Sequence, residues 1–192
     1  MCFFCYGVDK LAKTEKSNPS AEAMVLSLRA MGYDLSTAIA DLVDNSITAH
    51  ANLIRIDFSW NDGEPWILIS DDGDGMSESE LKKAMKPGSQ SPNDVRKSDD
   101  LGRFGLGLKT ASWSQCKEMT VLTLKGGNYS NRCWNLDYVV SNDKWELLLD
   151  LSPLTRDLML KRLISSDTGT AVLWQNLDLS LIHISEPTRL GM

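Results

Sequence analysis

The chain has 192 residues, 42% of them hydrophobic, which is enough to bury one sizeable core. Its 20 basic and 26 acidic residues give a formal net charge of −6, which argues against a general nucleic-acid-binding protein. No apolar run approaches the roughly 18 residues of a membrane span, and the first ten residues do not resemble a secretory signal. The four cysteines form no disulfide framework, so we expect a cytoplasmic protein without a membrane partner.

Three segments differ in character along the chain. Residues 1–19 are irregular and polar toward their end, and residues 20–178 carry the periodic patterns of one domain. The stretch "LSLIHISEPTR" from Leu179 to Arg189 resembles a translated sequencing adapter. We therefore expect residues 179–192 to be a non-native tail and the domain to be truncated at its C-terminal end.

Two helices come first in the predicted order. Residues 21–31 have helical spacing that stops at Gly32, and Asp34 is a plausible N-cap for the second helix. The second helix contains "ADLVDNSITAHA" and has two faces. Its apolar face holds Ile39, Leu42, Val43, Ser46 and Ile47, and its polar face holds Asp41, Asp44, Asn45 and Thr48. Short polar side chains are poor helix formers, so a solvated surface is an incomplete explanation of this stripe.

A hairpin and an acidic glycine motif follow. Residues 53–60 alternate as a strand does, "NDGE" signals a turn, and residues 65–70 form the return strand. "SDDGDGM" (Ser70 to Met76) begins at the end of that strand, and its glycines allow a sharp turn and a close approach to a ligand. The alternative is a plain acidic turn. A calcium loop is excluded because the glycines come too early.

A short helix over 77–85 leads into a long stretch without periodicity, residues 86–105. Loops of this length inside a domain are usually functional lids or disordered segments. Between Lys82 and Lys109 there are seven basic residues against three acidic ones. This local charge favours a phosphate ligand, and a solvated basic loop is the alternative.

The segment "GRFGLGLKTAS" (Gly102 to Ser112) places three glycines before a predicted helix. Helix N-termini with bare backbone N–H groups bind phosphates. The segment is not a P-loop, because Leu108 separates Gly107 from Lys109.

The remaining chain predicts the rest of a sheet. Four apolar-rich runs read as strands, over 119–126, 129–139, 144–151 and 170–177, and a helix over 155–164 precedes the last. The six tryptophans are expected in core packing. The element order predicts a two-layer α/β sandwich with a mixed, mostly antiparallel sheet.

Five motifs in this order resemble one superfamily. They are the acid-and-Asn helix, D-x-G-x-G, the basic lid, G-x-x-G-x-G and "DTGTAVLW" at 167–174. Together they resemble the GHKL ATP-binding domains (gyrase, heat-shock chaperone, histidine kinase and MutL), which have the Bergerat fold. The resemblance covers roughly residues 21–177 and is closest to the MORC and MutL-like proteins.

The resemblance implies a site for ATP and Mg²⁺. Asn45 would hold the Mg²⁺ ion through its carboxamide oxygen, a hard ligand of the kind that ion prefers. Asp41, one turn earlier, would be the catalytic base that orients or deprotonates the attacking water. Asp71 would accept a hydrogen bond from the adenine amino group, with Gly75 letting the base sit close and Met76 packing on its face.

The resemblance also assigns the lid and the last strand. Gly105, Gly107 and Lys109 match the part of the lid that closes over the β- and γ-phosphates, and Thr170 matches a threonine that steadies the adenine-binding aspartate. The other residues expected to contact the nucleotide are Asp44, Gly73, Gly102, Arg103, Phe104, Leu106 and Leu108.

The chain differs from the family pattern in three places. Asp41 stands where Glu is usual, Thr48 where Asp is common and His50 where Gly is common. The shorter Asp41 implies slow ATP hydrolysis, because a misplacement of about 1 Å can cost roughly 100-fold in rate. The expected function is a Mg²⁺-dependent ATPase module whose lid closure drives homodimerisation on ATP or binding of a protein or DNA client through downstream domains. The alternatives are a nucleotide-binding switch without turnover and a histidine kinase catalytic domain.

Overall fold

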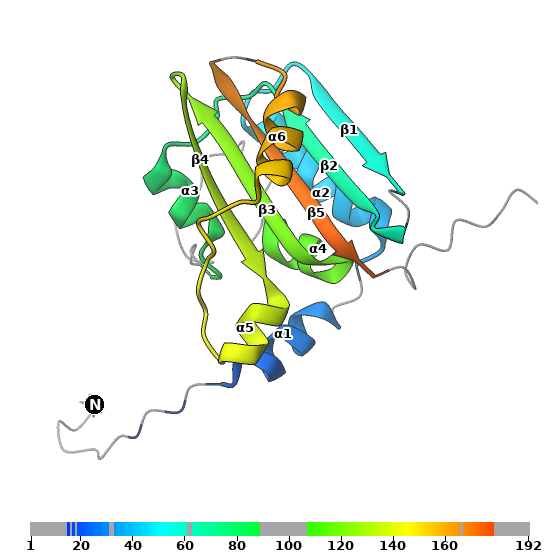
Figure 1. Ribbon diagram of the computed structural model, residues 1–192, viewed down its shortest axis with the longest axis vertical. Coiled ribbons are helices and arrows are strands. Elements are labelled where there is room, and N and C mark those ends of the chain that lie inside the picture. Colours follow the sequence, from blue (N-terminus) through cyan, green and yellow to red (C-terminus); the bar gives the residue numbers. More distant parts are fainter. Residues whose placement is uncertain are drawn as a thin grey trace, which may run out of the picture.

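The computed structural model describes residues 15, 17, 19–30, 33–60, 63–88, 107–165 and 167–178. Five strands form one sheet in the order β1-β2-β5-β3-β4 (Figure 1). The strands are β1 (Ile54–Ser59), β2 (Trp66–Asp71), β3 (Cys116–Lys125), β4 (Asn128–Asn135) and β5 (Thr168–Leu177). The helices are α1 (Ala21–Arg29), α2 (Leu35–Thr48), α3 (Glu78–Met85), α4 (Gly107–Gln115), α5 (Leu136–Asn142) and α6 (Pro153–Arg162).

The helices α2 and α4 lie behind the sheet in the view of Figure 1, and α6 crosses its front. The larger core lies on the side of α1, α2 and α4 and includes Trp113, Trp134 and Trp174. A smaller cluster around Met159 packs α6 onto the opposite face. The predicted α/β sandwich is therefore confirmed, with α6 covering part of the second face. No helix in the described part of the chain is long and apolar enough to cross a membrane.

The sheet is antiparallel at every pairing that the structure describes, rather than mixed. The pairs β1–β2 and β3–β4 are hairpins, and β5 inserts between β2 and β3 antiparallel to both. The strands β2 and β3 therefore run in the same direction, but they are not neighbours. This separation could not be inferred from element order.

The helix starts follow the capping residues in the sequence. The side chain of Asp34 accepts a hydrogen bond from Thr37 N at 2.7 Å and caps α2. Ser77 and Glu80 form a capping box at the start of α3. Both starts were predicted, because a cap satisfies orphan backbone donors within three residues and needs no tertiary contact.

Two of the predicted strands are wrong in part. The run 129–139 changes from β4 to α5 at Asn135, whose side chain caps the helix by accepting from Tyr138 N at 2.9 Å. The run 144–151 is not a strand, and only Leu148 forms a β-bridge, to Cys133. Its Trp145 ring instead lies 6.1 Å from Trp113 and 6.0 Å from Trp134. The segment is thus held by this one bridge and by the aromatic contacts of Trp145.

Candidate functional site

Asp71 ends β2 and is the most enclosed acidic side chain of the site, with 6% of its surface exposed. Its Oδ1 atom accepts hydrogen bonds from Gly73 N at 3.0 Å and Thr170 N at 3.2 Å, and its Oδ2 atom accepts from Ser46 Oγ at 2.8 Å. Burial raises the pKa of Asp71 above its ordinary value, although these three hydrogen bonds act in the opposite direction. The carboxylate is thus held in one orientation with acceptor capacity left for a ligand.

Ser46 is a site residue that sequence reasoning missed. The spacing placed it on the apolar face of α2, and it is indeed buried there. Its hydroxyl donates to Asp71 across 25 residues of sequence. The available signal was one hydroxyl on an otherwise apolar stripe, since a buried hydroxyl needs a partner. On the same face, Ile47 is exposed rather than buried.

Glycines of the D-x-G-x-G motif are required by close backbone contacts. A Cβ atom at Gly75, where φ is +63°, would lie 1.9 Å from the carbonyl oxygen of Leu124, and one at Gly73 would lie 2.6 Å from that of Ala49. A Cβ atom at Gly169 would lie 2.4 Å from the carbonyl oxygen of Asp71. The motif therefore fits tightly between β3, β5 and the end of α2.

We expect Gly75→Ala to lower the free energy of unfolding by more than about 2 kcal/mol, because both the positive φ and the backbone clash oppose a side chain. Gly126→Ala is the matched control. Its φ is +59°, but a Cβ atom there meets nothing within 4 Å, so the cost is about 1 kcal/mol. Urea unfolding measures both variants. Equal losses would contradict the steric explanation.

Thr123, on β3, joins the motif to the last strand and was also missed. Its hydroxyl accepts from Met76 N at 2.8 Å and donates to Gly169 O at 3.1 Å. The hydroxyl of Thr170 lies 3.2 Å from that of Thr123. Thr170 was predicted to steady Asp71, and its backbone N–H lies at hydrogen-bonding distance from that carboxylate. Met76 is half-buried and packs against the larger core.

The polar stripe of α2 lies beside the start of α4. Asp41 is half-buried, whereas Asp44 and Asn45 are exposed. A Cβ atom at Gly107, the first residue of α4, would stand 3.7 Å from Asp41 Oδ2. The predicted base therefore faces a helix N-terminus, and helix N-termini favour anionic ligands. Residues Gly102 to Leu106, predicted to contact the nucleotide, lie outside the described residues, as does most of the predicted lid.

Lys109 is buried within α4 and turned toward α3. Only 2% of its surface is exposed, and its Nζ atom donates to the carbonyl oxygen of Ala84 at 2.7 Å. Burial lowers the pKa of Lys109 from 10.5 to about 8. Contact of this ammonium with phosphate, as the resemblance implies, stays a prediction. Leu108 beside it is half-buried and packs against the larger core.

The lowered pKa of Lys109 predicts a pH-dependent stability. Above about pH 8 the unfolded chain retains a proton on this side chain that the folded chain has lost. Stability therefore rises with pH, by up to about 1 kcal/mol per unit. We expect Lys109→Met to remove this rise between pH 7.5 and 9, measured by urea unfolding relative to the parent chain. Replacing exposed Lys82 in the same way leaves the rise intact. An unchanged rise in Lys109→Met would contradict the assignment.

His50 follows the C-cap of α2 in a left-handed conformation, with φ of 60°. Glycine is the usual residue at such a position, which accounts for the family preference that this chain departs from. The Nδ1 atom of His50 lies 2.8 Å from Asp74 Oδ2, so the residue is fixed at the helix end. His50 is therefore a helix-end residue.

The side-chain oxygen atoms on the polar face of α2 fit a metal ion that is bound together with a nucleotide. Among the described residues, no group of three or more His, Cys, Asp or Glu side chains could hold a metal ion by itself. Asn45 offers one exposed carboxamide oxygen on the same helix face as Asp41. Mg²⁺ at nucleotide sites is commonly held by only one or two side-chain oxygen ligands, with phosphate oxygens and waters completing its coordination.

Comparison with known proteins identifies a family. Residues 33–170 match the family described as histidine kinase-, DNA gyrase B-, and HSP90-like ATPase. The chain is 35% identical over 91 residues to "ATPase morc-1" of Caenorhabditis elegans. The matched segment covers 47% of this chain and 10% of that protein. It is 31% identical over 80 residues to "Protein MICRORCHIDIA 4" of Arabidopsis thaliana, and the matched segment covers 39% of this chain and 10% of that protein. It is 33% identical over 90 residues to "DNA mismatch repair protein MutL" of Coxiella burnetii, and the matched segment covers 46% of this chain and 15% of that protein. The matched segments thus span only a small part of these relatives.

Proposed function

The chain belongs to the histidine kinase-, DNA gyrase B-, and HSP90-like ATPase family, and from this premise we propose that it binds ATP with Mg²⁺ and hydrolyses it slowly. The observation that carries the proposal is the buried Asp71 carboxylate, fixed by Ser46, Gly73 and Thr170. A fixed acceptor at a strand end suits an exocyclic amino group such as that of adenine. The acceptor capacity that these three hydrogen bonds leave on the carboxylate suits a ligand that donates a hydrogen bond to it.

The second half of the proposed site lies on α2 and α4. Asn45 would hold the Mg²⁺ ion, which supplies charge neutralisation between the phosphates when bound. Asp41 would orient or deprotonate the attacking water beside the N-terminus of α4. The nucleotide would therefore extend from Asp71 along α2 toward Gly107. Asp44 and the lid residues 102–106 would complete the contacts with the nucleotide.

The proposed output of the site is a change in association. The basic lid, residues 86–105, would close on the γ-phosphate when ATP binds. An ordered lid would present a new surface to a partner, and such ordering by a γ-phosphate is a known switching mechanism. We propose that this ordering promotes homodimerisation or binding of a protein or DNA client. The similar proteins of Caenorhabditis elegans and Coxiella burnetii are named as an ATPase and a DNA mismatch repair protein.

Magnesium dependence of ATP affinity tests this function. We expect calorimetric titration to give tighter ATP binding with Mg²⁺ than with EDTA, and Asn45→Ala to lose that difference because the ion loses its protein ligand. Asn142→Ala, an exposed replacement on α5, is the matched control and should keep the magnesium effect. Absence of ATP binding by the parent chain would refute the proposal. A magnesium effect unchanged in Asn45→Ala would refute only the assigned ligand.

A further inference from the structure

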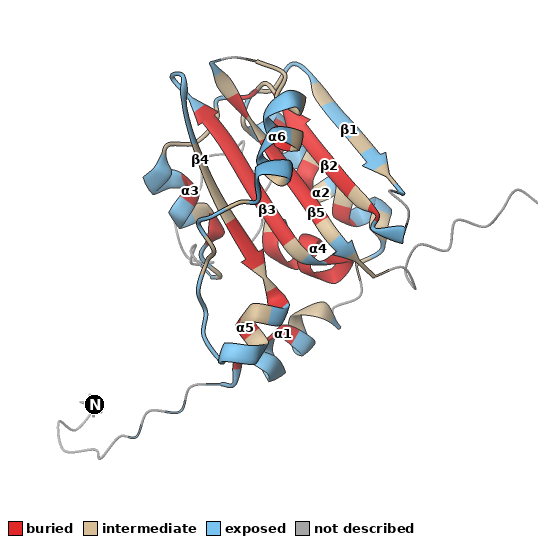
Figure 2. Cartoon of the chain, viewed as in Figure 1, coloured by how far each residue is buried: buried red, intermediate tan, exposed pale blue. Residues whose placement is uncertain are grey.

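The strand β1 forms an open edge of the sheet. It pairs with β2 on one side, and no strand in the described ranges pairs with its other side. Figure 2 shows β1 largely exposed or half-exposed, in contrast to the buried central strands. Exposed edge strands readily pair with another chain unless charges, prolines or bulges prevent it. The segment "IRIDFS" contains no proline, and its register with β2 is continuous, without a bulge.

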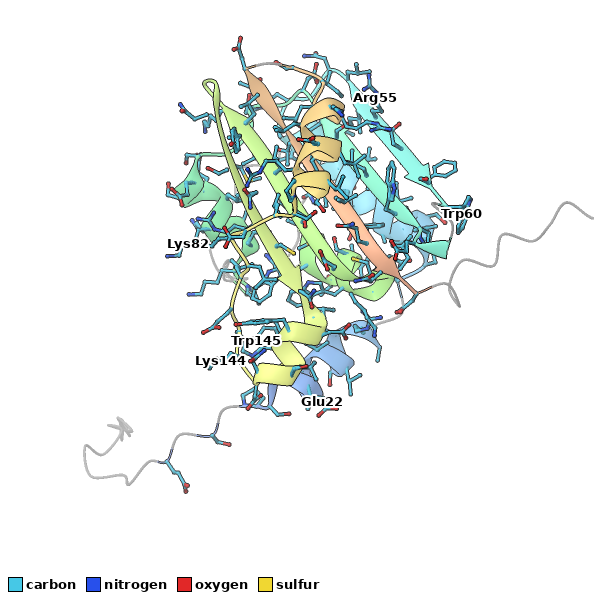
Figure 3. All side chains as sticks on the ribbon, viewed as in Figure 1. Glu22, Arg55, Trp60, Lys82, Lys144 and Trp145 are labelled. Carbon is cyan, nitrogen blue, oxygen red and sulfur yellow. The ribbon has the colours of Figure 1, made fainter. Side chains whose placement is uncertain are left out.

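The side chains of β1 that face α2 are unusually apolar for an edge. Phe58 is 70% exposed, Trp60 just beyond the strand is 49% exposed, and Ile56 is 42% exposed. Figure 3 shows Arg55 and Trp60 along this outer edge of the sheet. An apolar cavity of about 220 Å³ lies between this strand and α2, with Phe58, Trp60 and Leu35 among its lining residues. A contiguous exposed apolar surface of this kind is typical of an interaction site.

The backbone groups at this edge have a defined direction. The carbonyl oxygen of Leu53 accepts from Asp72 N, so the main-chain groups of residue 53 face β2. Main-chain groups alternate sides along an antiparallel strand. Those of Ile54, Ile56 and Phe58 therefore point outward from the sheet. These three residues can form a ladder with a strand added from outside.

The charges of β1 are placed symmetrically about Ile56. Arg55 is exposed and forms no hydrogen bond or ion pair within the described part of the chain. The side chain of Asp57 is 29% exposed, and within the described residues its one ion-pair partner is Arg162, whose Nε atom lies 3.3 Å from Asp57 Oδ2. Both side chains lie on the face of the sheet that carries α6, because they pair with Ser70 and Leu68.

We propose that two copies of this chain pair through β1, antiparallel, about a twofold axis at Ile56. In this register Arg55 of each copy stands opposite Asp57 of the other, and Ile54 stands opposite Phe58. Opposite charges and apolar–aromatic pairs directly across an antiparallel pair are both stabilising. Moving the axis by one residue sets Arg55 against Arg55, or Asp57 against Asp57, and like charges directly opposite are destabilising. The charge pattern thus selects a second copy in one register.

This association is independent of nucleotide and goes beyond the ATP-dependent dimer of the proposed function. A closed twofold contact uses the same patch on both copies, as most soluble homodimers do. The added strand would also cover the exposed surfaces of Ile56 and Phe58. The pairing would join two five-stranded sheets into one continuous sheet.

Cysteine cross-linking tests the register in the full chain, with Cys2 and Cys5 replaced by Ser and without ATP or Mg²⁺. Across the axis the Cα atoms of residue 56 would lie about 5.5 Å apart, within disulfide range. We expect Ile56→Cys to give a disulfide-linked dimer on mild oxidation. Phe58→Cys is the matched control on the same face, with Cα atoms about 14 Å apart, and should not cross-link. Equal cross-linking of both variants, or of neither, would overturn the proposal.

Charge variants test the pairing without cysteines. We expect the parent chain to dimerise in a concentration series by sedimentation, and Arg55→Asp to weaken the dimer about tenfold because both ionic pairs become repulsive. A mixture of Arg55→Asp and Asp57→Arg chains should associate more tightly than either alone, since the mixed pair restores opposite charges. A monomeric parent chain, or a dimer indifferent to these changes, would overturn the proposal. ATP affinity measured on the same samples reports the proposed function separately.

Discussion

Asp41→Asn is expected to bind ATP with an affinity close to that of the parent chain and to lose its turnover. An amide cannot accept the proton of the attacking water, and a positioned general base typically contributes about 10²- to 10⁴-fold. Asp41 stands beside the first residue of α4, where a γ-phosphate would be placed by the helix N-terminus. Steady-state phosphate release measures turnover, and calorimetric titration measures affinity.

Two further variants sharpen this experiment. Asp41→Glu restores the residue usual in the family and should retain turnover, since the longer side chain extends the reach by one C–C bond. Asp157→Asn changes an exposed acid on α6, on the opposite face of the sheet, and should change neither quantity. If Asp41→Asn hydrolysed ATP as fast as the parent chain, Asp41 would not be the base. If the parent chain itself bound ATP without turnover, the chain would act as a nucleotide switch.

Asp71→Asn is expected to lower ATP affinity by about 10- to 100-fold, because a charge-assisted hydrogen bond to the base is worth roughly 1.5–3 kcal/mol. The fold should tolerate the change. The amide oxygen can still accept from Gly73 and Thr170, and Ser46 can reverse its role and accept from the amide nitrogen. Calorimetric titration of ATP and urea unfolding of the same samples separate the loss of binding from any loss of stability.

The raised pKa of Asp71 adds a pH dependence to this comparison. The folded chain holds the Asp71 proton more tightly than the unfolded chain does, so this group favours folding at low pH. That contribution is lost as pH rises through the folded pKa of Asp71. We therefore expect the stability of Asp71→Asn relative to the parent chain to increase with pH over that range. A constant difference would contradict the raised pKa.

Asp72→Asn is the matched control for Asp71→Asn. The Oδ1 atom of Asp72 accepts from Asn52 N and Leu53 N, both at 2.8 Å, and these hydrogen bonds lower its pKa. Its replacement changes the neighbouring carboxylate outside the proposed site and should leave ATP affinity unchanged. An equal loss of affinity in both variants would show that the turn as a whole, rather than Asp71, determines binding.

The order of motifs was enough to predict the superfamily, and the family match confirms it. Local signals were equally informative about element starts. Asp34 caps its helix as predicted, the helix that follows Ser77 starts where expected, and β1 and β2 pair as the two strands of the predicted hairpin. These features depend on residues within a few positions of one another, so the sequence contains their physical cause.

Predictions from the sequence failed where distant contacts compete with local propensity. Residues 144–151 have strand-like composition, yet Trp145 packs on Trp113 and Trp134. The position of β5 between β2 and β3 also depends on long-range pairing. Neither outcome follows from periodicity, because the stabilising partners lie far away in the chain.

In the candidate site, too, some features follow from the local sequence and others depend on long-range contacts. The sequence by itself determined which residue types are available, an acidic and amide stripe on α2 and a glycine-rich acidic turn after β2. Only the tertiary structure decided that Ser46 and Thr170, 25 and 99 residues from Asp71, hold its carboxylate, and that Lys109 turns toward Ala84. The physical reason is that a buried polar atom takes its partner from whatever the fold brings within about 3 Å, whatever the distance along the chain.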